Sequence, residues 1–225
     1  MNEKPILFNA EMVNAILGGR KTQTRRVISE KTLHLFGVAA SAGECHPLEM
    51  CDQRSQSYYL EFCSLGKPGD QLWVRETFAL LGNEDGVCVD WQDNMVKSDE
   101  QAAARIYKAS CEQKHGDYGL YSIPDSAYWK PDTSNMKYEG SWRPSIHMPR
   151  WASRINLLIT GVRVERLNDI SDADASAEGC KISSMQSGEC LSDVFARLWK
   201  SIYGDKSWQA NPWVWVIEFE RMEAK

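Results

Sequence analysis

The chain has 225 residues, 43% of them hydrophobic, and a formal net charge of −5, values that are typical of one globular domain. No apolar run approaches the roughly 18 residues of a membrane helix. Residues 1–10 lack the apolar region of a signal peptide, so we expect a cytoplasmic protein. The acidic balance disfavours tight binding of long nucleic acid, because cations must neutralise its phosphates. Two short basic segments, residues 20–26 and 143–154, are compatible with a small basic pocket.

The first predicted elements are a strand at residues 4–8 and a helix that Asn9 caps at its N-terminus. Apolar residues recur at helical spacing after Asn9, and Gly18 with Gly19 is a typical helix end. The residues of this apolar face are Met12, Val13, Ile16 and Leu17. The polar segment 20–26 therefore begins where a helix ends.

The middle of the chain is less regular. Residues 27–66 give no firm prediction, the Lys-Pro-Gly-Asp sequence at 67–70 predicts a turn, and residues 72–78 predict a strand. Residues 79–140 are polar with little periodicity, and this segment far exceeds the roughly 15 residues of a plain loop. We therefore expect one domain over residues 1–225, with an insertion of loops and short elements at about 79–140.

Two regular elements are predicted next. Residues 155–167 carry β-branched residues and predict a strand with a break near Gly161. Ser171, followed by Asp174 three residues later, is a variant of the capping box that opens a short helix, and Gly179 ends this helix.

The last elements are a helix and a strand. Ser192 is expected to cap a helix with one apolar stripe, which comprises Val194, Phe195, Leu198, Trp199 and Ile202. Residues 213–219 form a strongly apolar closing strand. Short strands interleaved with short helices predict an α+β fold. A small barrel fits this pattern, since closing the sheet removes its edges.

Seven cysteines without a secretion signal indicate free thiols. The only candidate zinc ligands are Cys45, His46, Cys51 and Cys63. Their spacing lacks the paired CxxC of structural zinc sites, so the sequence predicts no metal site.

Lys21 and Thr24 are the first candidates for chemistry. In a helical or 3₁₀ turn their spacing of three places them on one side. A lysine beside a hydroxyl is a recognisable nucleophile pair if burial depresses the lysine pKa far enough for the amine to be neutral. The alternative is a helix C-terminus whose cations complement the helix dipole.

Four segments together resemble the ASCH family of the PUA-like superfamily. They are GRKTQTRR at residues 19–26, PGDQLWVRETF at 68–78, ISDADASAEGC at 170–180 and WVWVIEF at 213–219. The first is similar to the GRKT-x-T-x-R signature of the small N4-acetylcytidine amidohydrolases. This chain is about twice as long as those enzymes, mainly through residues 79–140, and resembles ASCH proteins of phage and prophage genomes.

The resemblance implies catalytic roles for Lys21, Thr24 and Glu178, with no metal or organic cofactor. In one scheme Thr24 is the nucleophile, Lys21 accepts its proton, and Glu178 holds Lys21 or protonates the departing amine. A carboxylate beside Lys21 favours the charged ammonium, however. In the second scheme, therefore, Glu178 activates a water, charged Lys21 stabilises the oxyanion and Thr24 orients the substrate.

Three further residues are candidates for substrate binding. Arg26 and Arg75 are suited to a cytosine carbonyl or a sugar, and Glu76 is a second carboxylate that faces either the pocket or solvent. Several tryptophans are candidates for base stacking or for the core, namely Trp142, Trp151, Trp213 and Trp215. His147 is expected to be structural.

The resemblance thus implies an amidohydrolase that removes the acyl group from N4-acetylcytidine and related nucleosides. Its expected partner is a small-molecule nucleoside, with RNA a less favoured ligand and no membrane. The alternatives are a non-catalytic PUA-like RNA-binding module that holds a base in the same cleft, and an ASCH-type ribonuclease. The sequence does not indicate an oligomeric state.

Overall fold

The computed structural model describes most of the chain, namely residues 2–50, 52–82, 87–92, 94–96, 99–111 and 142–222. The chain divides into two compact units. The first unit comprises residues 1–4, 18–72 and 157–223, and the second unit comprises residues 5–17, 73–156 and 224–225. No helix within the described ranges is long and apolar enough to span a membrane.

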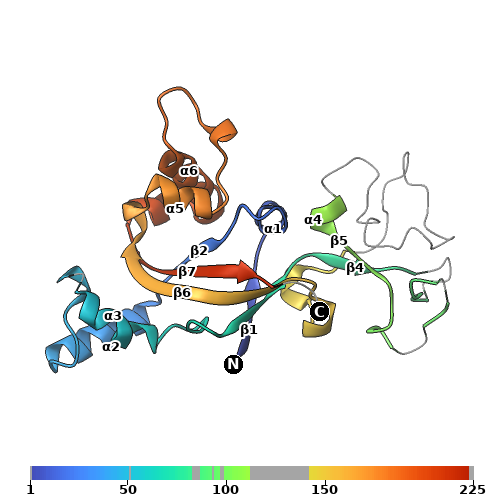
Figure 1. Ribbon diagram of the computed structural model, residues 1–225, viewed down its shortest axis with the longest axis horizontal. Helices are drawn as coiled ribbons and strands as arrows, with labels where there is room; N and C mark the ends of the chain where they lie inside the picture. The colour runs from blue at the N-terminus through green and yellow to red at the C-terminus, as the bar shows by residue number, and fades with distance from the viewer. Residues whose placement is uncertain are drawn as a thin grey trace. The chain divides into compact units, whose positions relative to one another are not determined.

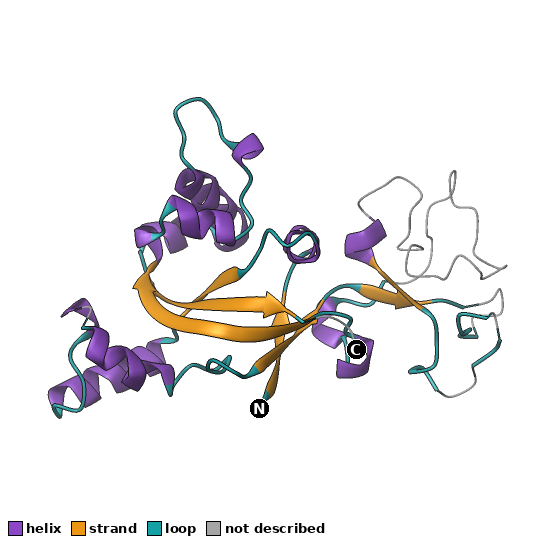
Figure 2. Cartoon of the chain, viewed as in Figure 1, coloured by secondary structure: helices purple, strands orange, loops and turns teal. Residues whose placement is uncertain are grey.

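The larger sheet has five strands in the order β1-β3-β6-β7-β2 (Figure 1). Its strands are β1 (Glu3–Leu7), β2 (Gln23–Val27), β3 (Gln71–Arg75), β6 (Asn156–Arg166) and β7 (Trp213–Arg221). Helices and strands are both well represented (Figure 2). The fold is therefore α+β, as the sequence predicts.

The sheet is mixed. Gln71 N donates to Asn2 O and Phe8 N donates to Arg75 O, so β1 and β3 run in the same direction. Strand β7 pairs antiparallel with both β6 and β2. Strands β1 and β2 are the two edges, so the described strands form an open sheet and not the closed barrel expected from the sequence.

Strand β7 separates two layers of the first unit because its side chains alternate between the faces of the sheet. Val214 and Val216 pack with Phe195 and Trp199 of α6 (Leu191–Tyr203) in one apolar cluster. On the other face, the ring of Trp215 meets the ring of Phe36 from α2 (Glu30–Ser41) edge-on. Figure 1 shows α5 and α6 on one side of the curved β6-β7 pair.

The predicted break in β6 is a β-bulge. Ile159 pairs with Phe219, whereas Gly161 pairs with Glu218, so one residue of β6 is extra. A Cβ atom built on Gly161 lies only 2.5 Å from Oε2 of Glu218. The bulge thus requires a residue without a side chain beside Glu218.

The helix caps partly match the prediction. Helix α5 (Asp172–Ala177) begins with a complete capping box, in which Ser171 accepts from Asp174 N and Asp174 caps the Ser171 backbone. The N-cap of helix α6 lies two residues before the predicted cap. Cys190, not Ser192, is its N-cap, because Asp193 bonds back to the Cys190 backbone.

Residues 27–66, for which there was no firm prediction from the sequence, contain helices. These helices are α2, the 3₁₀ helix η1 (Leu48–Met50) and α3 (Gln53–Leu60). The other short elements of the first unit are η5 (Leu167–Asp169), η6 (Ile182–Ser184) and α7 (Asp205–Gln209).

The second unit has a smaller core. Its elements are α1 (Ala10–Leu17), β4 (Phe78–Leu80), β5 (Arg105–Tyr107), α4 (Lys108–Cys111), η3 (Ser145–His147) and η4 (Arg150–Ala152). Asn9 caps α1 by accepting from Met12 N. Strands β4 and β5 pair antiparallel, and Phe78, Tyr107 and Met148 pack in one cluster.

The predicted strand at 72–78 is two strands, because β3 ends at Arg75 and β4 begins at Phe78. The predicted insertion at 79–140 contains β5 and α4 in its described part. Residues 83–86, 93, 97–98 and 112–140 of the predicted insertion lie outside the described residues.

The alternation of buried and exposed positions on α6 generates the first prediction. Phe195→Ala should lower the free energy of unfolding by about 3–5 kcal/mol, since it leaves a cavity among packed rings. Ile202→Ala on the same helix is the control, because Ile202 is 41% exposed and should lose less than about 1 kcal/mol. Urea titration of both variants measures the difference. Equal losses would contradict the packing described for this helix.

Candidate functional site

A buried ion pair joins two residues that are far apart in the sequence. Lys21 forms an antiparallel bridge with Glu178, and Thr22 N donates to Ala177 O at 2.8 Å. Glu178 is the C-cap of α5, and Gly179 follows it with φ +97°, a conformation that suits glycine. The end of α5 is thereby fixed against the residues that precede β2.

The side chains of this pair are in direct contact. Lys21 Nζ donates to Glu178 Oε2 at 2.5 Å and to the Glu178 carbonyl oxygen at 3.0 Å. Lys21 is 2% exposed and Glu178 is 5% exposed. The other carboxylate oxygen, Oε1, accepts from Arg25 Nη1 at 3.3 Å. Each oxygen of Glu178 therefore faces a different cation.

Burial lowers the pKa of Lys21, because desolvation penalises the ammonium. The charge of Glu178 opposes this effect, and the nearby charge of Arg26 adds to it. Burial also raises the pKa of the neighbouring Cys180 thiol to about 11. Burial thus makes the Lys21 ammonium easier to deprotonate, while it keeps Cys180 a neutral thiol.

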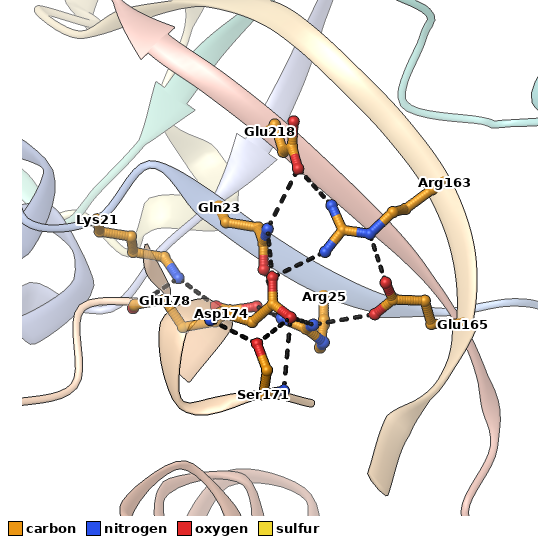
Figure 3. A network of polar contacts seen from close by, with 9 residues as sticks. All are labelled: Lys21, Gln23, Arg25, Arg163, Glu165, Ser171, Asp174, Glu178 and Glu218. Atoms are coloured by element: carbon orange, nitrogen blue, oxygen red, sulfur yellow. Dashed lines mark hydrogen bonds and ion pairs between the residues drawn. The ribbon is translucent and has the colours of Figure 1, made fainter. Parts of the chain in front are cut away.

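Arg25 connects this pair to a wider polar network (Figure 3). Its guanidinium donates to Gln23 Oε1 at 2.6 Å and to Glu165 Oε2 at 3.1 Å, and it lies 3.5 Å from Asp174 Oδ2. The Arg25 side chain is fully buried. Desolvation of this cation is costly unless anions surround it, and three carboxylates do.

Arg163 closes the outer side of the same network (Figure 3). It donates to Asp174 Oδ1 at 2.8 Å and forms ion pairs with Glu165 and Glu218. Hydrogen bonds from Ser171 and Gln23, with the charges of Arg25 and Arg163, lower the pKa of Asp174 to about 2 against the effect of burial.

Thr24 is placed differently from the prediction. Gln23–Val27 is a strand and not a helical turn, so residues three apart do not share a side. Thr24 lies opposite Ile217 and Arg25 lies opposite Val216, which puts Thr24 on the sheet face away from Arg25. Thr24 is 2% exposed. No hydrogen bond described for this part of the chain joins its hydroxyl to Lys21 or Glu178.

The three residues expected to bind substrate have other contacts. Arg26 lies opposite Trp215 and donates to the Tyr203 hydroxyl at 3.2 Å. Arg75, in the second unit, donates to the carbonyl oxygens of Ser145 and Ile146. The Arg75 guanidinium thus holds the backbone of η3.

Glu76, also in the second unit, is 2% exposed. Its two oxygens accept from Arg154 at 2.8 and 3.0 Å, and Arg154 also donates to Ser110 Oγ. Burial raises the pKa of Glu76, while Arg154 opposes that effect. Both oxygens of Glu76 are therefore occupied by one guanidinium.

Two other predictions concern aromatic residues and metals. Trp213 and Trp215 are buried in the first unit, with 7% and 4% exposure. Within the described ranges, no group of three or more His, Cys, Asp or Glu side chains is arranged to hold a metal ion. Cys51, one of the candidate zinc ligands, lies outside those ranges.

A surface pocket of about 570 Å³ lies elsewhere on the first unit. Its lining includes Phe36, Gly37, Arg166 and Trp213 but neither Lys21 nor Glu178. The Arg166 guanidinium lies over the Trp213 ring at 4.2 Å. We place the candidate chemistry at the Lys21–Glu178 pair, because burial lowers the pKa of Lys21 and perturbed pKa values cluster at functional sites.

The residues that sequence reasoning missed are Arg25, Gln23 and Asp174 as members of the site. A signal for the first two was present. Lys21, Gln23 and Arg25 alternate with period two, and such alternation indicates one face of a strand. The reading of residues 20–26 as a turn concealed this pattern.

The buried pair generates the second prediction. Glu178→Gln should lower the free energy of unfolding by about 3 kcal/mol, because it leaves the Lys21 and Arg25 cations without a full partner. The double variant Lys21→Met/Glu178→Gln should recover part of this loss, since it also removes a buried cation. Urea titration of the two variants gives the comparison. A double variant less stable than Glu178→Gln would contradict the assignment of a costly buried charge.

Comparison of the chain with protein-family models, with curated proteins and with solved structures finds no match.

Proposed function

We propose that this protein is an amidohydrolase that removes the acyl group from N4-acetylcytidine and related N4-acylated cytosine nucleosides. The observation that supports the proposal most directly is the buried Lys21–Glu178 contact of 2.5 Å. A lysine whose pKa is lowered by burial is suited to accept a proton from a nucleophile. The reaction needs such a group, because an amide nitrogen leaves only after protonation.

In the proposed reaction the Thr24 hydroxyl oxygen attacks the acyl carbonyl carbon while Lys21 accepts the hydroxyl proton. The bond between the acyl carbon and N4 then breaks, and the cytosine amine leaves with that proton. Water hydrolyses the acyl ester of Thr24 and releases a carboxylate. The resemblance alone supplies Thr24 as the nucleophile, since the structure puts its side chain on the sheet face away from Arg25. The pKa of Lys21, lowered by burial, supports Lys21 as the base.

The occupation of Glu178 argues against the alternative in which this carboxylate activates a water. Oε1 accepts from Arg25 and Oε2 accepts from Lys21, and two cationic donors stabilise a carboxylate in its ionised form. Glu178 is therefore better suited to holding Lys21 than to removing a proton from water.

The family is part of the same proposal. We propose that the curved sheet and the α5 helix correspond to an ASCH-type fold of the PUA-like superfamily, with the described strands forming an open sheet instead of a closed barrel. The helix–strand connection at residues 18–23 and the bridge between Lys21 and Glu178 support it. These features bring the GRKT segment and the AEG segment together, as the resemblance implies.

The third prediction tests the activity. Purified protein should convert N4-acetylcytidine to cytidine and acetate, measured by chromatography. Thr24→Ala should remove nearly all turnover, whereas Thr24→Ser keeps a hydroxyl and should retain part of it. Arg54→Gln is a control, since the Arg54 side chain is 83% exposed and pairs with Asp52; its turnover should be unchanged.

Two outcomes would contradict parts of this proposal. Measurable turnover of Thr24→Ala, with a greater loss in Glu178→Gln, would make water the nucleophile. Absence of cytidine from the unmodified protein, with retained binding of an acetylated oligonucleotide, would favour a non-catalytic RNA-binding module.

The fourth prediction concerns the size of the substrate. Free nucleosides should be better substrates than acetylated cytosines within RNA, because a chain of net charge −5 repels a polyanion. N4-acetylcytidine and an acetylated oligonucleotide are compared at equal concentration of modified base, at low and moderate salt. Faster deacetylation of the oligonucleotide that weakens with salt would overturn this prediction.

A further inference from the structure

Glu178 lies between two buried cations that bind opposite oxygens. Lys21 takes Oε2 at 2.5 Å, and Arg25 takes Oε1 at 3.3 Å. Arg25 cannot move away from this position easily, because Gln23, Glu165 and Asp174 hold the rest of its guanidinium. The carboxylate is therefore fixed at both oxygens, and Arg25 is itself held in place by further acceptors.

We propose that Arg25 is a positioning residue for the Lys21 amine: it holds Glu178 in the orientation that contacts Lys21, and its charge reduces the hold of Glu178 on the Lys21 proton. The base role of Lys21 in this inference rests on the proposed function, but the effect of Arg25 on the Lys21 proton does not. This effect of Arg25 resolves a conflict, because the adjacent Glu178 carboxylate favours the charged ammonium whereas a base must be neutral. A cation on the far oxygen offsets part of the attraction that keeps the ammonium charged.

The geometry of the network makes this role specific to a guanidinium. Arg25 meets acceptors in several directions, and only a planar fork of five N–H groups reaches them together. Its Nε atom is buried and has no hydrogen-bond partner among the described residues. The guanidinium carbon lies 5.8 Å from the centre of the Phe195 ring. A lysine at this position could bind one carboxylate but could not bridge Glu178 to Glu165.

Several charged groups set the field at these two cations. Those acting on Lys21 are Glu178, Arg26 and Cys180, and those bound to Arg25 are Glu178, Glu165 and Asp174. Arg163 and Glu218 lie one step further out. Removing Arg25 takes a positive charge from the far side of Glu178 and makes the Lys21 ammonium more stable. Removing the negative charge of Glu165 makes the Lys21 ammonium less stable, because the positive charge of Arg25 is then less neutralised.

This opposition of signs gives the fifth prediction. Arg25→Gln should raise the midpoint of Lys21 titration by about one pH unit, and Glu165→Gln should lower it by a smaller amount. Arg163→Gln is the matched control, since Arg163 belongs to the same network but does not touch Glu178. It should shift the midpoint by well under half of the Arg25 effect. General destabilisation of the fold cannot produce shifts of opposite sign.

The midpoint is measured by ¹³C NMR of protein labelled at the lysine Cε atoms, and the Lys21 resonance is identified by its loss in Lys21→Met. This measurement does not require activity. The Glu165 side chain is 25% exposed, so Glu165→Gln should fold even if Arg25→Gln does not. In that case the direction of the Lys21 midpoint shift in Glu165→Gln tests the proposal without Arg25→Gln. Kinetic pH profiles with N4-acetylcytidine provide the second readout, in which the acidic limb should follow the NMR midpoint.

The outcomes separate the two proposals. Opposite shifts without any cytidine release would support Arg25 as a positioning residue and reject the amidohydrolase. Cytidine release with an unchanged Lys21 midpoint in both Arg25→Gln and Glu165→Gln would retain the enzyme and overturn this role of Arg25. Equal shifts in Arg163→Gln and Arg25→Gln would overturn it too, since Arg25 contacts Glu178 and Arg163 does not.

Discussion

The first unit is organised around the cost of burying positive charge. Lys21 and Arg25 are both almost completely buried, and each requires anionic partners to offset the loss of hydration. The partners come from two elements that are distant in the sequence, since Glu165 belongs to β6 whereas Asp174 and Glu178 belong to α5 and its C-cap. Packing of α5 against β2 is thus fixed by charge as well as by apolar contacts.

The apolar part of that packing surrounds the network on one side. Phe195 and Trp199 cover the face of β7 that carries Val214 and Val216, and Phe195 lies near the Arg25 guanidinium. Low polarity around the charges strengthens each electrostatic interaction. It also explains why the lysine pKa falls although a carboxylate is adjacent: the desolvation of Lys21 outweighs the attraction of Glu178.

Regular amphipathic patterns allowed much of the fold to be predicted from the sequence. The capping box of α5, the break in β6 and the last strand follow from local rules that involve few residues. The helix α2 was missed because its apolar residues do not form a single buried stripe, since Leu35 and Val38 are exposed. The helix α3 was missed because most of its residues are polar. The cap of α6 was wrongly predicted at Ser192, because serine is a preferred N-cap residue and cysteine is not. The cap at Cys190 depends instead on the hydrogen bond from Cys190 N to the Asp193 carboxylate.

The pairing of Lys21 with Glu178 was expected only from the resemblance, because 157 positions separate the two residues and no local pattern relates them. Their contact arises from the tertiary path that brings the end of α5 beside β2. The position of Thr24 was mispredicted for a simpler reason. Its spacing from Lys21 was interpreted with the period of a helix, while the segment pairs with β7 as a strand.

Asp174 serves two elements at once. It completes the capping box of α5 through Ser171, and the same carboxylate binds Arg163 and lies beside Arg25. Loss of the Asp174 contacts would therefore disrupt the first turn of the helix and the charge network at the same time. The amide protons of α5 should exchange with solvent in a single cooperative unit with those of the adjoining strand, so local unfolding would expose the buried cations only when the helix itself is lost.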